Sequence, residues 1–163
     1  MIFMSKAEYN PEIKRNYISM FHMMPRWAYN LAKRSGLFRV VGFFMAFMWL
    51  RAHKMPRPRT MADVLRIFYF EFLRVPPQNC EVMKLTSTEL VTRSDSDCPI
   101  LDFARQINVD TRDTCRVISE PMSNWFMRFL NNRLEFKRNY KMIRPYSPQC
   151  EETITFRSSK VKS

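Results

Sequence analysis

The stretch from Cys98 to Phe156, CPILDFARQINVDTRDTCRVISEPMSNWFMRFLNNRLEFKRNYKMIRPYSPQCEETITF, decides the fold that we expect for this chain. Asp97 and Pro99 suit the N-cap and the first position of a helix. Apolar residues then recur at helical spacing before the pattern changes to alternation. The stretch thus predicts helices over residues 99–107 and 111–130, the second kinked or divided at Pro121, and then strands over LEFKRNY and CEETITF.

The residues before this stretch predict one strand pair preceded by helices. CEVMKLTS and TELVTRS alternate apolar and polar residues, which is typical of half-buried strands. The prolines of KMPRPRT interrupt a helical region, and Thr60 can cap the helix that follows. Helices are expected within residues 5–21, 25–36, 37–54 and 60–75. The predicted fold class is therefore α+β, with N-terminal helices followed by a small antiparallel sheet with inserted helices.

Length indicates a single domain, residues 1–163, whose two halves differ in charge. Residues 1–74 form a basic half rich in Met and Phe, with 13 Lys and Arg against 4 Asp and Glu. Residues 75–157 form the α+β half, and residues 158–163 form a tail. A basic half of this kind is typical either of a solvated face or of a surface that meets phosphate, anionic lipid or an acidic protein.

The most apolar segment, VVGFFMAFMWL from Val40 to Leu50, bears on location. A helix that spans a membrane needs about 20 such residues, so this segment predicts a helix that is buried or shared with a partner or a membrane surface. We therefore expect a protein that is not membrane-spanning. The start of the chain lacks the layout of a secretory signal, which predicts a cytoplasmic protein with reduced thiols.

The cysteines are the first candidates for chemistry. Cys98 stands at a predicted helix N-terminus, where the helix dipole favours the thiolate. A nucleophile or ligand is one interpretation of this residue, and an inert buried thiol is the other. Cys150 and Glu152 share one face of the last strand while Glu151 points the other way, so Glu152 is the better partner for that thiol.

A metal site is a further interpretation. Cys98, Cys115 and Cys150 could meet in space around a divalent metal, with Glu151 or Glu120 beside them. Close cysteine pairs of the zinc-binding type are absent, and no redox cofactor or nucleotide motif is expected. The metal prediction therefore depends on the fold alone.

Nucleic-acid binding is a third class of function. KMPRPR and KRNYK place cations among prolines or aromatics, which suits phosphate and stacking contacts. The motifs of known nucleic-acid modules do not occur, which makes this the weakest of the three classes.

Four features from Cys98 onward resemble the L-2-amino-thiazoline-4-carboxylic acid hydrolase-like family. They are Cys98-Pro99, a cysteine in the following helix (Cys115), the phrase N-x-x-L-x-F (Asn131 to Phe136) and C-[DE]-x-x-x-x-F (Cys150 to Phe156). The resemblance covers residues 80–156. It implies an α+β domain and the hydrolysis of a cyclic C–N or C–S bond in a small molecule.

Two functions are therefore expected. In the first, the chain is a hydrolase-like domain with a pocket edged by cysteines, where Cys98 and Cys150 act with Glu152. Glu120, Glu151 and Arg144 would then bind the small-molecule substrate, since a planar guanidinium suits a carboxylate. In the second, the chain is a non-catalytic binding or assembly subunit that docks on a larger protein complex through its basic, apolar N-terminal helices.

Overall fold

The computed structural model describes residues 24–157. The helix expected within residues 5–21 and the tail at residues 158–163 lie outside that range. The helical elements are α2 (Arg26–Ser35), α3 (Leu37–Ala52), α4 (Met61–Leu65), η1 (Arg66–Phe72), η2 (Pro77–Asn79), α5 (Pro99–Gln106), α6 (Thr111–Thr114), η3 (Cys115–Ser119) and α7 (Glu120–Leu130). The strands are β1 (Cys80–Leu85), β2 (Glu89–Ser94), β3 (Leu134–Asn139) and β4 (Cys150–Phe156).

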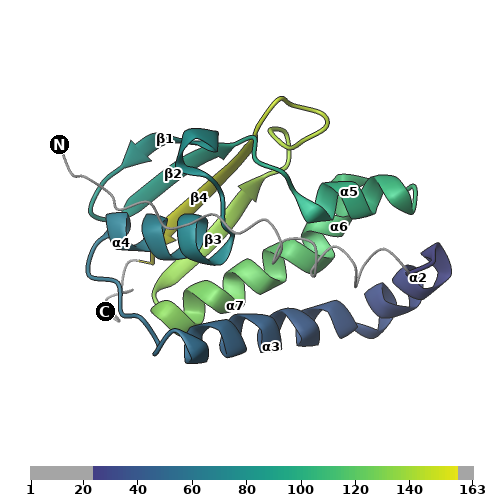
Figure 1. The fold of residues 1–163 in the computed structure, drawn as a ribbon, viewed down its shortest axis with the longest axis horizontal. Coiled ribbons are helices and arrows are strands. Elements are labelled where there is room, and N and C mark those ends of the chain that lie inside the picture. The colour runs from purple at the N-terminus through teal and green to yellow at the C-terminus, as the bar shows by residue number, and fades with distance from the viewer. Residues whose placement is uncertain (1–23, 158–163) are drawn as a thin grey trace, which may run out of the picture.

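The four strands form one antiparallel sheet in the order β1-β2-β4-β3. The predicted α+β class is confirmed, because helices precede the sheet and helices α5 to α7 are inserted between β2 and β3. Figure 1 shows α7 running between the sheet and α3, so that sheet, α7 and α3 form successive layers. The outermost of these layers is α3.

Side chains alternate across β2, β3 and β4 as the period-2 pattern predicts, whereas β1 is exposed after Cys80 and has a register shift between Val82 and Lys84. Leu90, Ile154 and Phe136 face one another in register across three strands and are buried. The next row on the same face is polar and consists of Thr92, Glu152 and Arg138. The side of the sheet that covers the core therefore carries one apolar row and one charged row.

Two predicted helix boundaries are confirmed, the end of α2 at Gly36 and the start of α4 after Thr60. Gly36 ends α2 in the left-handed region, with φ at 73°, where glycine meets no steric penalty. The Thr60 side chain accepts a hydrogen bond from the backbone N–H of Asp63, and the Asp63 carboxylate accepts one from Thr60 in return. These reciprocal bonds form a capping box, which starts α4 directly after the proline-rich break.

Helix α3 packs tightly against α7. A Cβ at Gly42 would lie only 3.1 Å from the Met122 Cβ, so the missing side chain permits this close approach. Phe38, Ala46 and Leu50 are buried on the same side of α3. One face of this apolar helix is therefore used inside the molecule.

Two local predictions need correction. The N-cap of α5 is Cys98 and not Asp97, and no side chain caps it. The long helix from Thr111 is interrupted before Pro121, through the π-helical segment η3, and α7 then begins with Pro121 in its first turn. A proline is tolerated there because the first turn of a helix needs no hydrogen bond from its N–H.

Two apolar clusters hold these elements together. The larger cluster joins the second half of α3 to η1, α7 and the sheet. The smaller joins α2 and the start of α3 to α5, η3 and Ile143. Both draw residues from the basic half and from the α+β half of the chain.

Candidate functional site

The chemistry-bearing residues gather around Arg138, between the sheet and the helices. Its guanidinium forms an ion pair with Glu152 from the adjacent strand, and the Nε–Oε1 distance is 3.0 Å. The two side chains are only 7% and 5% exposed. Burial disfavours a charged guanidinium, but the adjacent carboxylate outweighs it and the pKa of Arg138 is raised above its ordinary value. This ion pair is thus almost completely removed from water.

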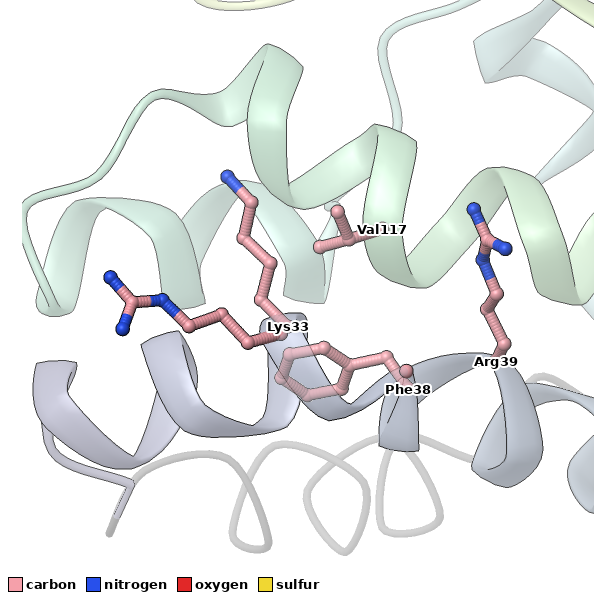
Figure 2. Close-up of a pocket in the computed structure, with 6 residues that line it drawn as sticks. Lys33, Phe38, Arg39 and Val117 are labelled. Atoms are coloured by element: carbon pink, nitrogen blue, oxygen red, sulfur yellow. The ribbon is translucent and has the colours of Figure 1, made fainter.

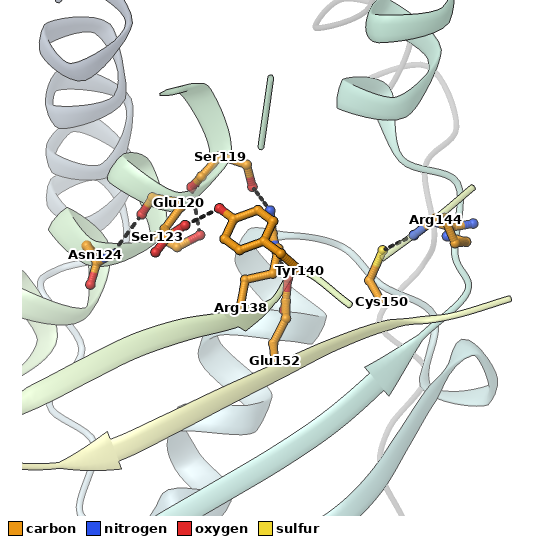
Figure 3. Close-up of polar contacts among 9 residues, drawn as sticks. All are labelled: Ser119, Glu120, Ser123, Asn124, Arg138, Tyr140, Arg144, Cys150 and Glu152. Carbon is orange, nitrogen blue, oxygen red and sulfur yellow. Dashed lines mark hydrogen bonds and ion pairs between the residues drawn. The ribbon is translucent and has the colours of Figure 1, made fainter. Parts of the chain in front are cut away.

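Helix residues complete the surroundings of the pair. Arg138 Nη1 also donates to Ser119 Oγ at 3.1 Å, at the junction between η3 and α7 (Figure 3). Next to it, Tyr140 donates its hydroxyl proton to the Glu120 carboxylate. Burial and this hydrogen bond raise the pKa of Tyr140. Glu120, predicted to bind substrate, therefore already has an internal partner.

Two of the three cysteines of the predicted site, Cys98 and Cys115, feel the charge of this same guanidinium. Cys98, Cys115 and Cys150 are close enough to interact electrostatically with one another, and Arg138 acts on the first two. The pKa of Cys98 is nevertheless raised, because desolvation outweighs the helix N-terminus and the cation. Burial likewise raises the pKa of Cys115 to about 12. The expected thiolate at Cys98 is therefore not favoured by its surroundings.

Thiol reactivity offers a direct check. We expect Cys80, Cys98 and Cys115 to react with iodoacetamide at pH 8 more slowly than in the unfolded chain, since all three have raised pKa values. The folded chain holds these protons more tightly, so stability should fall as the pH rises from about 9 toward 12. Peptide mapping by mass spectrometry and denaturation at graded pH measure the two effects. Rapid alkylation of Cys98 in the folded chain would contradict this prediction.

Arg144 and Cys150 lie together at the edge of the cluster. The Arg144 backbone N–H points to the Cys150 sulfur at 3.4 Å. The guanidinium of Arg144 donates to the main-chain carbonyls of Asp95, at 2.9 Å, and of Ser96. It thereby ties the loop before β4 to the segment before α5. Two of its donors are occupied in this way and are not directed at an open substrate site.

Glu151 lies on the opposite face of the sheet from Glu152, as the alternating pattern predicts. It accepts hydrogen bonds from Arg93 Nε and Asn139 Nδ2, both at 2.8 Å. These contacts lower the pKa of Glu151, with the Asn139 amide contributing most. Glu151 is thus separated from the thiols, and it does not join the other predicted site residues.

The metal prediction gains no support from the geometry. Within residues 24–157 no group of three or more His, Cys, Asp and Glu side chains is arranged to hold a metal ion. Arg138 acts electrostatically on Cys98 and Cys115, so the nearest charged group to these two thiols is a cation.

The second candidate region is the surface of α2 and α3. Residues 24–62 contain eight Lys and Arg and no Asp or Glu. Among the described residues, Lys33 is the one member of this group that forms an ion pair, with Asp113. Figure 2 shows Lys33 and Arg39 on either side of Phe38 and Val117. These residues line a hollow of about 230 Å³ that is open to solvent.

An apolar stripe runs along the other side of α3. Leu37, Val40, Phe44 and Met48 are spaced three or four residues apart and are all exposed, Phe44 to 56% and Met48 to 60%. We call these four residues the outer stripe. Seven of the eleven large apolar residues exposed in the described part of the chain lie between Trp27 and Met55. This concentration distinguishes the α2–α3 surface from the rest of the molecule.

The sequence predicts that these helices do not span a membrane. No single helix within the described residues is both long and apolar enough to cross a membrane. Taken together, α2 and α3 reach the necessary length and composition, but they are bent by 79° at Gly36.

Comparisons with known proteins leave the family open. The chain matches no protein-family model, and no curated protein or solved structure shows a significant match. The resemblance to the amino-thiazoline-carboxylate hydrolase-like family therefore stays a prediction from short motifs.

Sequence reasoning missed the residue at the centre of the cluster. Arg138 was expected to lie on a basic surface within KRNYK, but it is buried against Glu152, while Lys137 points to solvent. The alternation of LEFKRN contains the necessary signal, because Arg138 shares a face with Leu134 and Phe136. The predicted KRNYK surface for nucleic acid is therefore not formed, since Tyr140 is also bonded internally.

Proposed function

We propose that this chain is a non-catalytic docking subunit that attaches to a larger partner through the α2–α3 surface. The observation that carries the proposal is the outer stripe, four exposed apolar side chains on an acid-free and basic segment. Exposed apolar area of this kind is costly in water and is typical of an interaction surface.

The internal contacts of the predicted catalytic and substrate-binding residues also support docking over catalysis. Glu152 is paired with Arg138, Glu120 with Tyr140 and Glu151 with Arg93. The thiols of Cys98 and Cys115 favour the protonated form, which is a poor nucleophile. These contacts build the interior of the fold and leave its outer surface for recognition.

Native particle size tests the proposal. The full chain, tagged at its C-terminus and present at native level in the cells that make it, should elute from size-exclusion chromatography well ahead of a monomer. Phe44→Ser with Met48→Ser should shift it to the monomer position, because both side chains lie on the outer stripe. Wild-type chain that elutes as a soluble monomer and is also absent from the membrane fraction would overturn the proposal.

A matched control separates this effect from a general loss of apolar surface. Val82→Ser with Met83→Ser removes exposed apolar side chains from β1, at the far edge of the sheet. This control variant should elute as the wild type does. An equal shift for both variants would mean that the α2–α3 surface has no special role.

Hydrolysis of a small cyclic substrate is the second candidate function. The observation that favours it is that Cys98, Cys115 and Cys150, far apart in the sequence, lie close enough to interact electrostatically with one another. Cys98 would be the nucleophile and Glu152 would handle protons. Ring-opening of 2-amino-thiazoline-4-carboxylate by the purified chain, abolished in Cys98→Ser, would support this function, and activity unchanged by that substitution would exclude this role for Cys98.

A further inference from the structure

We infer that the partner of the α2–α3 surface is the face of an anionic phospholipid bilayer, an inference that rests on the proposed docking function. The first argument is the arrangement of apolar and basic side chains on the two helices. Helical spacing places Leu31 one turn after Trp27 and Arg34 almost one turn further, all exposed. On α3, Arg51 follows Met48 at the same spacing. Each apolar face therefore ends in an exposed arginine.

This arrangement fits the interface between headgroups and acyl chains. Leu, Val, Phe and Met side chains enter the acyl boundary, while arginines extend to the phosphates at its edge. Trp27 is exposed to 70%, and tryptophan favours the headgroup level of a bilayer. Within the described residues neither Arg34 nor Arg51 has an ion pair that a lipid phosphate would need to displace.

The packing of α3 decides how it can meet a bilayer. Its other face is buried against α7, with Gly42 in close approach to Met122. Lipid can therefore reach α3 along the outer stripe alone, over a length of about 24 Å for its 16 residues. The 79° bend after α2 also prevents a straight span. The helix must lie in the plane of the membrane surface, as a monotopic contact.

Charge argues against a second copy of this chain. Residues 24–62 carry eight cations and no anion, so two such surfaces placed face to face would repel each other. A nucleic acid would use the cations but would leave the outer stripe exposed to water. An anionic bilayer uses both features together, because it offers phosphate at its surface and hydrocarbon beneath.

Flotation of the full chain with lipid vesicles tests the inference. Binding is expected to phosphatidylcholine vesicles that contain about one third phosphatidylserine, and to be weakened by salt. Phe44→Ser with Met48→Ser should lower the partition coefficient more than about tenfold. Arg34→Gln with Arg51→Gln should lower it about thirty-fold, since each cation near an anionic surface contributes about 1 kcal/mol.

Two control variants and the particle-size experiment distinguish failure of the bilayer inference from failure of the docking function. Arg105→Gln with Arg133→Gln removes the same charge elsewhere, and Val82→Ser with Met83→Ser removes apolar side chains elsewhere; both should bind as the wild type does. Equal binding to pure phosphatidylcholine, or loss of binding in the controls, would overturn the inference. Absent vesicle binding beside a stripe-dependent large particle would also overturn it and indicate a protein partner, leaving the docking function intact. A monomer that binds no vesicle would overturn both.

Discussion

Replacing Arg138 with leucine should lower the free energy of unfolding by about 3–5 kcal/mol at neutral pH. The substitution leaves the Glu152 carboxylate in a site where its side chain is 5% exposed, without the cation that now neutralises it. It also removes the donor to Ser119 Oγ at the start of α7. Urea denaturation at pH 7, followed by circular dichroism, measures the loss.

The double variant Arg138→Leu with Glu152→Leu is the control for this prediction. It removes both charges, so most of the stability lost in the single variant should return, because no buried charge is left unpaired. A single variant that loses less than about 1 kcal/mol would show that the pair is accessible to water.

Replacing Phe126 with alanine should cost about 3–5 kcal/mol, through the cavity that it leaves. Phe126 is fully buried where α7 meets α3 and η1. Its ring stacks on Phe72 at a centroid distance of 4.1 Å and contacts Trp49 and Phe68, each at 5.4 Å. Such ring contacts add to the area that is buried. Denaturant unfolding measures the change.

Phe44→Ala is the matched control, because it removes the same side chain from the outer stripe. Phe44 is 56% exposed, so its loss should change stability by no more than about 0.5 kcal/mol. Similar losses for Phe126→Ala and Phe44→Ala would mean that the outer stripe is covered in the folded protein, and the docking proposal would lose its basis.

The fold class could be predicted because short-range sequence patterns determine where most helices and strands begin and end. Gly36, Thr60 and Pro99 each mark a helix boundary by local chemistry, and the alternation before Phe156 identifies the last strand. The π-helical segments η1 and η3 could not be predicted, since an additional residue within a helix turn depends on packing against other elements.

The candidate site was predicted only in part. A meeting of Cys98, Cys115 and Cys150 in space was one interpretation of the sequence. The raised pKa values of Cys98 and Cys115 could not be predicted, because the pKa of a thiol depends on how many apolar groups surround it in three dimensions. The sequence showed that Cys98 stands at a helix N-terminus, which lowers the pKa of its thiol. The desolvation that raises this pKa is apparent only in the folded structure.

The charged row on the sheet has a consequence for strand alignment. A slip of two residues between β3 and β4 keeps every side chain on its own face, so hydrophobic burial distinguishes such misalignments poorly. The same slip would move Arg138 from Glu152 to Ile154 or Cys150 and leave two buried charges unmatched. We therefore expect the Arg138–Glu152 pair to fix the register between β3 and β4, because the apolar pattern alone is compatible with more than one register.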